Sequence, residues 1–247
     1  MSARRIGDSI AIPGDYQYRA LHDGPAVQRF WHHGKLAAAE AALHPVAGDV
    51  VLDVGCGSGV LSARLGAIPG VRVIGVDANA DAIAFAQLTH AGDRVEFRLG
   101  LADELALEGE GINKIAFLEV LEHLPPRQAL EALEGFHGLL PVGGRVVLST
   151  PNGRSLWPLV EWTMDRLGLA PTMADEQHVS AWTPASVAAL GRSAGFEVEH
   201  VGTVHLVAPW AAALSMRLAH RLHAFEQRLG VSYGALVTAS LVKRGPA

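Results

Sequence analysis

Two glutamates and a histidine stand close together in an otherwise apolar stretch of the chain. In FLEVLEHL, residues 117–124, five of the eight residues are apolar, yet the stretch carries Glu119, Glu122 and His123. A buried carboxylate is costly unless it is paired, hydrogen-bonded or bound to a metal ion. An imidazole has an ordinary pKa near neutrality and can take a proton from a hydroxyl. These residue types at this spacing predict either acid–base chemistry or a cation site.

A second chemical pattern lies in VLDVGCGSG, residues 51–59. Gly55, Gly57 and Gly59 follow a β-rich run and precede a helical stretch, and glycines at such a turn let a ligand approach the backbone. Asp77 ends the next β-rich run, 22 residues beyond Gly55, where an acid accepts hydrogen bonds from ribose hydroxyls. Together these features predict a nucleoside site, and a tight turn without a ligand is the alternative.

The spacing of the glycines argues against a dinucleotide. A dinucleotide loop follows G-x-G-x-x-G around a pyrophosphate, whereas the third glycine comes one position earlier here. Asp53 precedes the loop, where it would repel phosphate and suit a cationic or amine-bearing ligand. S-adenosylmethionine (SAM) has an adenosine, an amino acid and a sulfonium but no phosphate, so it fits this pattern.

The elements that must position these residues alternate from residue 50 onward. Nearly continuous apolar runs predict strands buried on both faces of a parallel sheet; they lie at 50–55, 72–77, 95–100, 114–119 and 145–150. Two further strands are predicted at 197–204 and 235–243. Helices are predicted at 59–67, 79–91, 126–140, 183–195 and about 209–229.

The expected fold is therefore α/β. It is an open seven-stranded, mostly parallel sheet with helices on both faces and an antiparallel last strand. Residues 1–45 are expected to form a helical N-terminal cap on a domain of residues 46–247, with an insertion at about 151–183.

Composition and charge exclude several kinds of protein. The 247 residues are 49% hydrophobic and 18% charged, with a formal net charge of −5, so we do not expect a nucleic-acid partner. Cys56 is the only cysteine, which excludes an intrachain disulfide. The N-terminus has no apolar signal segment, and the longest apolar run, 204–216, is too short to span a bilayer. We expect a cytoplasmic protein.

Several blocks of the chain resemble the class I SAM-dependent methyltransferases, and especially the branch with the ubiquinone-pathway O-methyltransferases. The blocks span about residues 45–205 and read VLDVGCGSGVLS, VIGVDAN, FLEVLEHLPP, LLPVGGRVVLSTPN and HVSAWTPASVAALGRSAGFEVE. The resemblance implies a Rossmann-like fold. It also implies methyl transfer to a small metabolite, to oxygen rather than nitrogen, with a quinone precursor, a natural product or a lipid-like molecule as acceptor.

The resemblance also implies which residues contact the cofactor. Around its methionine part it places Asp53, Gly55, Gly57 and Gly59. We also expect Cys56, as a small filler of the loop, and Glu119 to belong to the cofactor pocket. Asp77 would take the ribose hydroxyls, and Ala78 and Asn79 would flank the adenine.

Two positions depart from the family pattern. Leu101 replaces the family's adenine-binding Asp, so either Asp103 or the backbone of Leu101 and Ala102 would contact the adenine. Ile112-Asn113 replaces a Phe-Asp pair before the fourth strand, a change that we expect to affect local structure rather than chemistry.

Three interpretations of FLEVLEHL remain open. In the first, Glu119 is a cofactor-pocket residue and Glu122 and His123 only start a helix. In the second, His123, beside Glu122, is a general base. In the third, Glu119, Glu122 and His123 bind a divalent cation, because Glu-x-x-Glu-His resembles a metal motif of the ubiquinone-pathway O-methyltransferases and of small-RNA 3′-terminal 2′-O-methyltransferases. A distant histidine completes the site in the latter, and His178 stands at the matching place. Such ligands favour Mg²⁺ or Mn²⁺, and two histidines would admit Zn²⁺ or Fe²⁺.

Two further segments bear on the acceptor. The segment 16–35 is expected to cover the cofactor and shape the acceptor pocket through Tyr18, Trp31 and His32, with His178 as a further contact. Alternatively, Phe30 and Trp31 only anchor a helix to the sheet. The helix within 209–230 carries an apolar stripe beside several arginines. It is expected to pack on the domain or on a second copy in a homodimer, and peripheral contact with a membrane is the alternative.

Two rival functions stay open beside methylation of a small molecule. One is methylation of an RNA 3′ end, which the Glu-x-x-Glu-His pattern and His178 favour and the acidic balance disfavours. The other is a non-catalytic protein that binds SAM.

Overall fold

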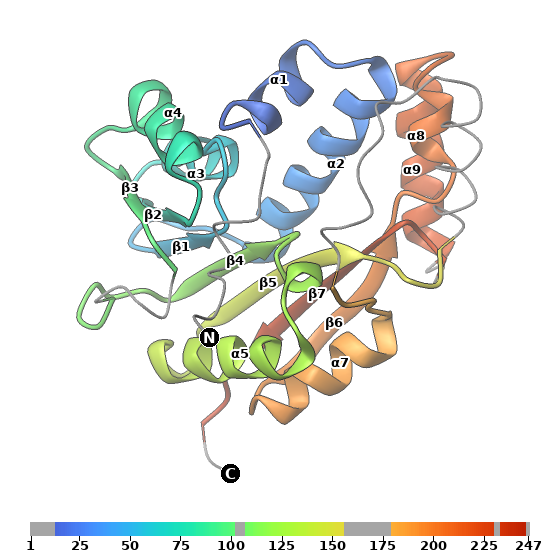
Figure 1. Ribbon diagram of the computed structural model, residues 1–247. Helices are drawn as coiled ribbons and strands as arrows, with labels where there is room; N and C mark the ends of the chain where they lie inside the picture. Colours follow the sequence, from blue (N-terminus) through green and yellow to red (C-terminus); the bar gives the residue numbers. More distant parts are fainter. Residues whose placement is uncertain (1–12, 102–106, 156–178, 230–232, 246–247) are drawn as a thin grey trace, which may run out of the picture.

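The computed structural model describes residues 13–101, 107–155, 179–229 and 233–245. A seven-stranded sheet forms its centre, in the order β3-β2-β1-β4-β5-β7-β6 (Figure 1). β1 to β5 run parallel, and β7 is antiparallel to both of its neighbours, β5 and β6. The strands are β1 Val50–Val54, β2 Arg72–Asp77, β3 Val95–Leu99, β4 Lys114–Leu118, β5 Arg145–Pro151, β6 Glu197–Val204 and β7 Leu236–Val242. The predicted open, mostly parallel sheet is confirmed.

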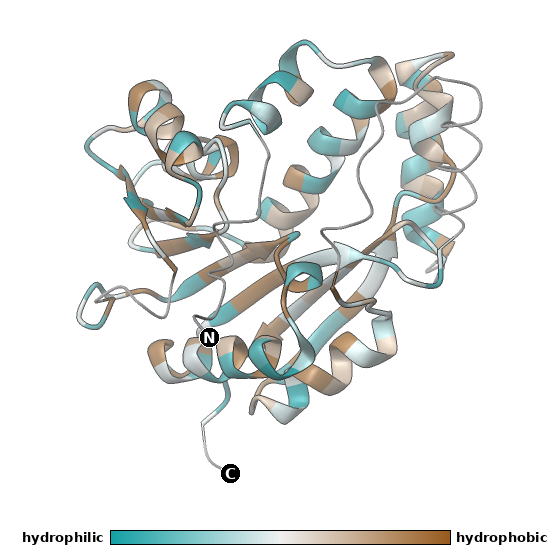
Figure 2. Ribbon diagram, in the orientation of Figure 1, coloured by the Kyte–Doolittle hydropathy of each residue, from teal (hydrophilic) through white to brown (hydrophobic). Residues whose placement is uncertain are grey.

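The two faces of the sheet bury alternate residues of the same strands. Leu52, Ile74 and Ile115 face one core, while Val51 and Val73 face the other, because successive side chains of a strand point to opposite faces. The central strands are accordingly hydrophobic along most of their length (Figure 2). This double burial explains why their sequences read as continuous apolar runs.

Helices cover both faces of the sheet. One core includes side chains of α5 (Pro126–Leu139) and α7 (Pro184–Ser193). The other includes side chains of α2 (Ala26–Leu43), α3 (Val60–Gly66) and α4 (Ala80–His90). Thr183 starts α7 with a capping box, since its hydroxyl accepts from the Ser186 N–H and Ser186 accepts from the Thr183 N–H.

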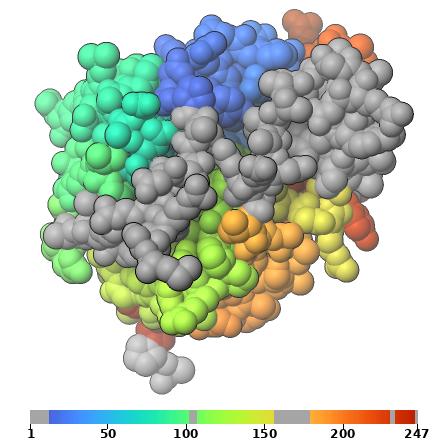
Figure 3. All heavy atoms as spheres, in the orientation of Figure 1, coloured from blue at the N-terminus to red at the C-terminus, as the bar shows by residue number. Residues whose placement is uncertain are grey.

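The N-terminal helices α1 (Tyr16–His22) and α2 lie next to α3 and α4 (Figure 1). On the face shown in Figure 3, the side chains of α1 and α2 close against those of α4. The ring of Tyr18 takes part in this contact, 5.3 Å from the ring of Phe85. The segment before β1 therefore forms a helical cover beside the turn between β1 and α3.

The single helix predicted at about 209–229 is wrong. The chain forms α8 (Ala208–Ala211), turns, and then forms α9 (Met216–Leu229). The buried Glu226 carboxylate accepts hydrogen bonds from the N–H groups of Leu206, Val207 and Ala208, at 3.2, 2.7 and 2.8 Å. In one unbroken helix, 18 residues would separate Glu226 from Ala208 by about 27 Å. The turn lets the acid return to cap α8.

Asn113 has a structural role at the amino end of β4. Its Oδ1 accepts from the Val50 N–H at 3.0 Å, and its Nδ2 donates to Asp49 Oδ1 at 2.9 Å. Lys114 pairs with the same aspartate at 2.8 Å. These contacts lie at the opposite end of β4 from Glu119. No helix within the described ranges has the length and hydrophobicity that crossing a membrane requires.

Candidate functional site

The turn from β1 into α3 has a backbone conformation that favours glycine. Gly55 and Gly57 have φ angles of 71° and 52°, which side chains other than glycine rarely adopt. A Cβ at Gly55 would lie 2.3 Å from Val120 Cγ2, and one at Gly57 would lie 2.8 Å from the Gln17 amide. Glycine is therefore favoured at both positions by the backbone conformation and by the close packing of Val120 and Gln17.

Asp77 ties this turn to the end of β2. Its Oδ2 accepts from the Gly57 N–H at 2.8 Å and its Oδ1 accepts from the Asn79 N–H at 2.8 Å. Asn79 caps α4, since its side chain accepts from the Asp81 and Ala82 N–H groups. A carboxylate has about four acceptor positions, so each oxygen of Asp77 keeps capacity for a hydroxyl. Asp77 therefore has the acceptor capacity that a contact with ribose hydroxyls would need.

Asp53 lies behind the glycine turn and is buried. Ser62 Oγ donates to Asp53 Oδ2 at 2.7 Å. Burial, together with the charge of Asp77, raises the pKa of Asp53 to about 6. The hydrogen bond from Ser62 opposes this rise. A cationic ligand beside Asp53 would favour its charged form.

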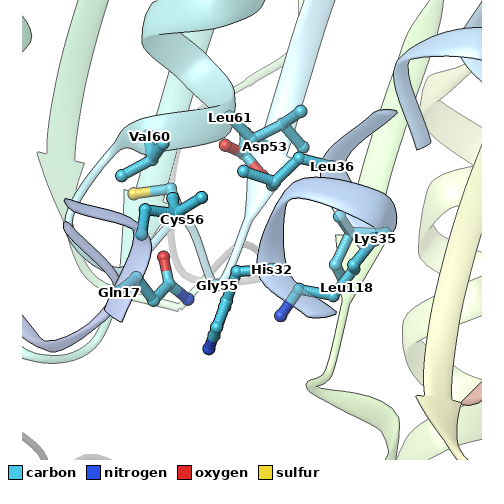
Figure 4. A pocket seen from close by; sticks show the side chains of 11 residues that line it. Gln17, His32, Lys35, Leu36, Asp53, Gly55, Cys56, Val60, Leu61 and Leu118 are labelled. Carbon is cyan, nitrogen blue, oxygen red and sulfur yellow. The ribbon is translucent and has the colours of Figure 1, made fainter. Parts of the chain in front are cut away.

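A cavity opens between the glycine turn and the N-terminal helices (Figure 4). Its internal volume is small, about 20 Å³, and the space around it continues into open solvent. The turn and its neighbouring elements contribute Asp53, Gly55, Cys56, Val60, Leu61 and Leu118; α1 and α2 contribute Gln17, Leu21, His32, Lys35 and Leu36. The lining is apolar on the α3 side and carries polar groups from α1 and α2.

An ion pair joins α2 to the end of β4. Lys35 Nζ lies 2.5 Å from Glu119 Oε2, with the two side chains 5% and 27% exposed. Burial alone would raise the pKa of Glu119. The charge and hydrogen bond of Lys35 outweigh that effect and, with smaller contributions from His32 and His205, hold this pKa below its ordinary value. Glu119 therefore carries its charge at the mouth of the site.

Glu119 also marks a sharp turn in the backbone. Its φ angle is 54°, outside the range that non-glycine residues normally adopt. Such strain persists only where the surrounding structure holds it, often at functional sites. Here the Glu119 N–H still pairs with the Ser149 carbonyl at 2.9 Å, and the side chain turns toward Lys35 on α2.

Glu122 faces a different environment in the short 3₁₀ turn η2 (Leu121–His123). Its side chain is buried, and Thr150 Oγ1 donates to its Oε2 at 3.0 Å. Burial, and then the charge of Glu119, raise the pKa of Glu122 to about 8. Glu122 is therefore mostly protonated at neutral pH. His123, which follows it, is half-buried and is not among the residues lining the cavity.

The described residues do not support the expected divalent cation. Within the described ranges, no three His, Cys, Asp or Glu side chains come together as metal ligands do, so Glu119, Glu122 and His123 do not form the expected group. The reason is that Glu119 is paired with Lys35, while Glu122 is buried against Thr150 and holds its proton. His178, Ala102 and Asp103 lie outside the described residues, and Leu101 is half-buried at the end of a described segment.

The three predicted acceptor contacts on α1 and α2 occupy different places. His32 lines the cavity, and burial, followed by the nearby charge of Lys35, lowers its pKa to about 4. Trp31 stacks on His205, with ring centres 4.6 Å apart, on the side of α8 and α9. Tyr18 packs against α4 and does not line the cavity.

The sequence analysis missed two polar residues that line the cavity, Gln17 and Lys35. The signal for Lys35 was present: residues 32, 35, 36, 39 and 43 share one face of a helix, and Leu36, Ala39 and Leu43 on that face are apolar. A lysine on a buried face is a candidate for function because its ammonium needs a partner. Gln17 carries no comparable signal.

Known proteins resemble this chain in both sequence and fold. The family model for a methyltransferase domain matches residues 26–201. Ubiquinone biosynthesis O-methyltransferase of Xanthomonas axonopodis pv. citri is 33% identical over 192 residues, which cover 74% of this chain and 77% of that protein. The enzyme of the same name from Pseudomonas paraeruginosa is 40% identical over 140 residues, 55% of each chain.

Solved structures share the fold at lower identity. The methyltransferase in a complex with the Trm112 methyltransferase activator of Haloferax volcanii has a TM-score of 0.66 at 20% identity, covering 99% of this chain and 100% of that one. Magnesium protoporphyrin IX methyltransferase of Synechocystis, with bound S-adenosylhomocysteine (SAH), has a TM-score of 0.62 at 19% identity. The match covers 93% of this chain and 94% of that one. The match to the family model and the order of the strands agree with the glycine turn and the acid after β2. This chain therefore belongs to the methyltransferase domain family and is a SAM-dependent methyltransferase.

Proposed function

We propose that this enzyme methylates a hydroxyl oxygen of a small, partly apolar molecule. The observation that carries the proposal is the cavity beside the glycine turn, where the neutral imidazole of His32 lies next to the Lys35–Glu119 ion pair. The relatives named ubiquinone biosynthesis O-methyltransferase support oxygen as the target atom, since one of them matches 74% of the chain.

The residues of the cavity fit SAM by their chemistry. Gly55 and Gly57 give the turn its left-handed backbone, with φ angles of 71° and 52°. Asp77, whose Oδ2 accepts from the Gly57 N–H, would also accept from the ribose hydroxyls. Lys35 and Glu119 are a cation and an anion side by side, as are the carboxylate and ammonium of an amino acid. We assign Lys35 to the cofactor's carboxylate and Glu119 to its amino group. When bound, SAM supplies a methyl group on a positively charged sulfur, which needs no further activation.

The chain must then orient the acceptor and receive its proton. His32 is neutral at physiological pH because its pKa is lowered to about 4, so one ring nitrogen can accept a hydrogen bond from a hydroxyl. If His32 takes the proton, the charge of Glu119 stabilises the imidazolium, since Glu119 raises the pKa of His32. His32 is thus our candidate proton acceptor, and His123 stays the alternative.

A turnover assay tests the proposal. The protein is incubated with SAM and a panel of phenols, catechols and prenylated catechols, together with amine and carboxylate acceptors. SAH release and the methylated product are measured by mass spectrometry. We expect product from hydroxyl acceptors with an apolar tail, and we expect His32→Gln to lower kcat while SAH affinity is kept.

Two outcomes would contradict the proposal. Methylation of amines alone would show that oxygen is not the target. Tight SAH binding without turnover of any acceptor would favour the non-catalytic alternative. The Lys114→Met variant serves as a control, because Lys114 and Asp49 form a similar ion pair at the far end of β4. This variant should leave turnover unchanged.

A further inference from the structure

The segment around α9 exposes an unusual amount of apolar surface. Twelve large hydrophobic side chains are exposed within the described residues, and seven of them fall between residues 207 and 233. We call four of them the α9 stripe: Leu214, Leu218, Phe225 and Leu229, which are 86%, 43%, 58% and 57% exposed. On α9 itself, residues 218, 225 and 229 lie on one side of the helix. Contiguous apolar surface of this kind is typical of an interaction site.

A row of positive charge runs beside the stripe. Arg217, Arg221 and Arg228 are all exposed, and their spacing of four and seven residues places them on one face of the helix, next to the stripe. None forms an ion pair with any residue that the structure describes. The one acid of α9, Glu226, points inward to the amides at the start of α8. The outer surface of α9 is therefore cationic in a chain whose net charge is −5.

We propose that the outer face of α9 docks on an anionic lipid bilayer. A helix with exposed apolar side chains beside arginines lies in the interface of a membrane, with the apolar side chains among the acyl chains and the arginines at the phosphates. A second copy of the chain fits this surface less well. A symmetric pair would bring the same face of both copies together, and with it two rows of three arginines.

The position of α9 connects this docking surface with the cavity. α8 and α9 pack against α2, where the ring of Phe30 lies 5.2 Å from that of His220 and 6.0 Å from that of His223 (Figure 1). α2 also carries His32 and Lys35. A bilayer on α9 would therefore lie one helix away from the cavity. The docking itself does not depend on which acceptor the enzyme uses.

Flotation with vesicles tests the docking. The full chain is mixed with vesicles of phosphatidylcholine alone or with phosphatidylcholine containing phosphatidylglycerol, and bound protein is measured as a function of lipid and salt. We expect binding to the anionic vesicles, little binding to the neutral ones, and weakening as salt rises. In the Arg217→Gln/Arg221→Gln/Arg228→Gln variant, the partition coefficient should fall about a hundredfold, since each arginine near the surface contributes about fivefold.

Two matched variants make the test specific. Arg94→Gln/Arg127→Gln/Arg192→Gln removes the same charge from exposed positions elsewhere and should leave vesicle binding within about threefold of the wild type, because charges away from the membrane interact weakly with it. Leu218→Ser/Phe225→Ser should weaken binding about tenfold per side chain, because each loses an apolar group that the bilayer would bury. All variants should keep SAH binding, which shows that they are folded and separates this test from that of the proposed reaction.

Three results would overturn the proposal. The first is no binding to anionic vesicles at low salt. The second is an equal loss in both arginine variants, which would mean that only overall charge matters. The third is a dimer in light scattering that Leu218→Ser/Phe225→Ser converts to a monomer, which would assign this face to a second copy of the chain.

Discussion

The assignment of Lys35 to the amino acid end of SAM predicts a selective loss of affinity in Lys35→Met. Methionine keeps much of the length of the side chain and removes the ammonium. The variant should bind SAH more weakly than the wild type does. It should bind 5′-methylthioadenosine, which has the adenosine and the sulfur but no amino acid, as well as the wild type does.

The magnitude follows from the burial of Lys35. Its side chain is 5% exposed, so the ammonium has little water around it, and its attraction to a carboxylate about 4 Å away is on the order of 4 kcal/mol before desolvation is counted. Desolvation of the carboxylate and the competing charge of Glu119 oppose that gain. The net value of a hydrogen bond to a charged group is about 1.5–3 kcal/mol. SAH affinity should therefore fall roughly 10- to 150-fold.

Calorimetric titration of both ligands into both proteins checks this prediction. The quantity of interest is the change in the affinity ratio of SAH to 5′-methylthioadenosine, because that ratio cancels general damage to the site. Lys114→Met is the matched control, since it breaks the ion pair between Lys114 and Asp49 at the opposite end of β4 from Glu119. It should leave the affinity ratio unchanged. Equal weakening of both ligands by Lys35→Met, or no weakening of SAH, would refute the assignment.

Four further predictions concern stability. The pKa of Glu122 is raised from an ordinary 4.5 to about 8, so between these values the folded state holds a proton that the unfolded chain has lost. The free energy of unfolding of the wild type, measured with urea, should fall as pH rises through this window, by up to about 1.4 kcal/mol per pH unit relative to Glu122→Gln. Parallel curves of this free energy against pH for the two proteins would contradict the prediction. Gly55→Ala should lose about 2 kcal/mol or more and SAH binding as well, because its Cβ meets Val120 at a positive φ. Gly135→Ala in α5, where a Cβ meets nothing, should gain about 0.5–1 kcal/mol in urea unfolding. A loss of stability in this variant would contradict the prediction. Asn113→Asp should cost about 1–3 kcal/mol at pH 7 and less at pH 4, because it places a carboxylate against Asp49; a cost that does not change with pH would exclude charge repulsion as the cause.

The strands were predictable because burial on both faces leaves a direct trace in the sequence. All seven observed strands end within one residue of the predicted bounds. Val50–Val54 and Arg72–Asp77 are nearly continuous apolar runs, so predicting them as strands did not depend on distinguishing a helical from a strand periodicity. The break between α8 and α9 leaves no such trace, since alanines and leucines on both sides favour a helix. It depends on a contact between Glu226 and the amides of residues 206–208, which local propensity does not contain.

The candidate site was predictable in its backbone but not in its side-chain partners. The glycine turn and Asp77 followed from spacing alone. The pairing of Glu119 with Lys35 did not, because 84 residues separate them. In a regular helix Glu119 and Glu122, three residues apart, would share a face. The positive φ at Glu119 and the 3₁₀ turn after it direct one carboxylate to α2 and the other to Thr150. A pattern of residue types therefore cannot show whether the two carboxylates meet.

The position of the last strand has a consequence for the order in which the protein can be made. β7 lies inside the sheet, between β5 and β6, although it follows both of them in the sequence. During synthesis, β6 leaves the ribosome with no strand to pair with and must wait until Leu236–Val242 has followed it. The nascent chain can therefore assemble β1 to β5 early, while β5 keeps an open edge until β7 emerges. A chain that ends before residue 236 would lose two strands from the sheet, not one, because β6 reaches the rest of the sheet only through β7.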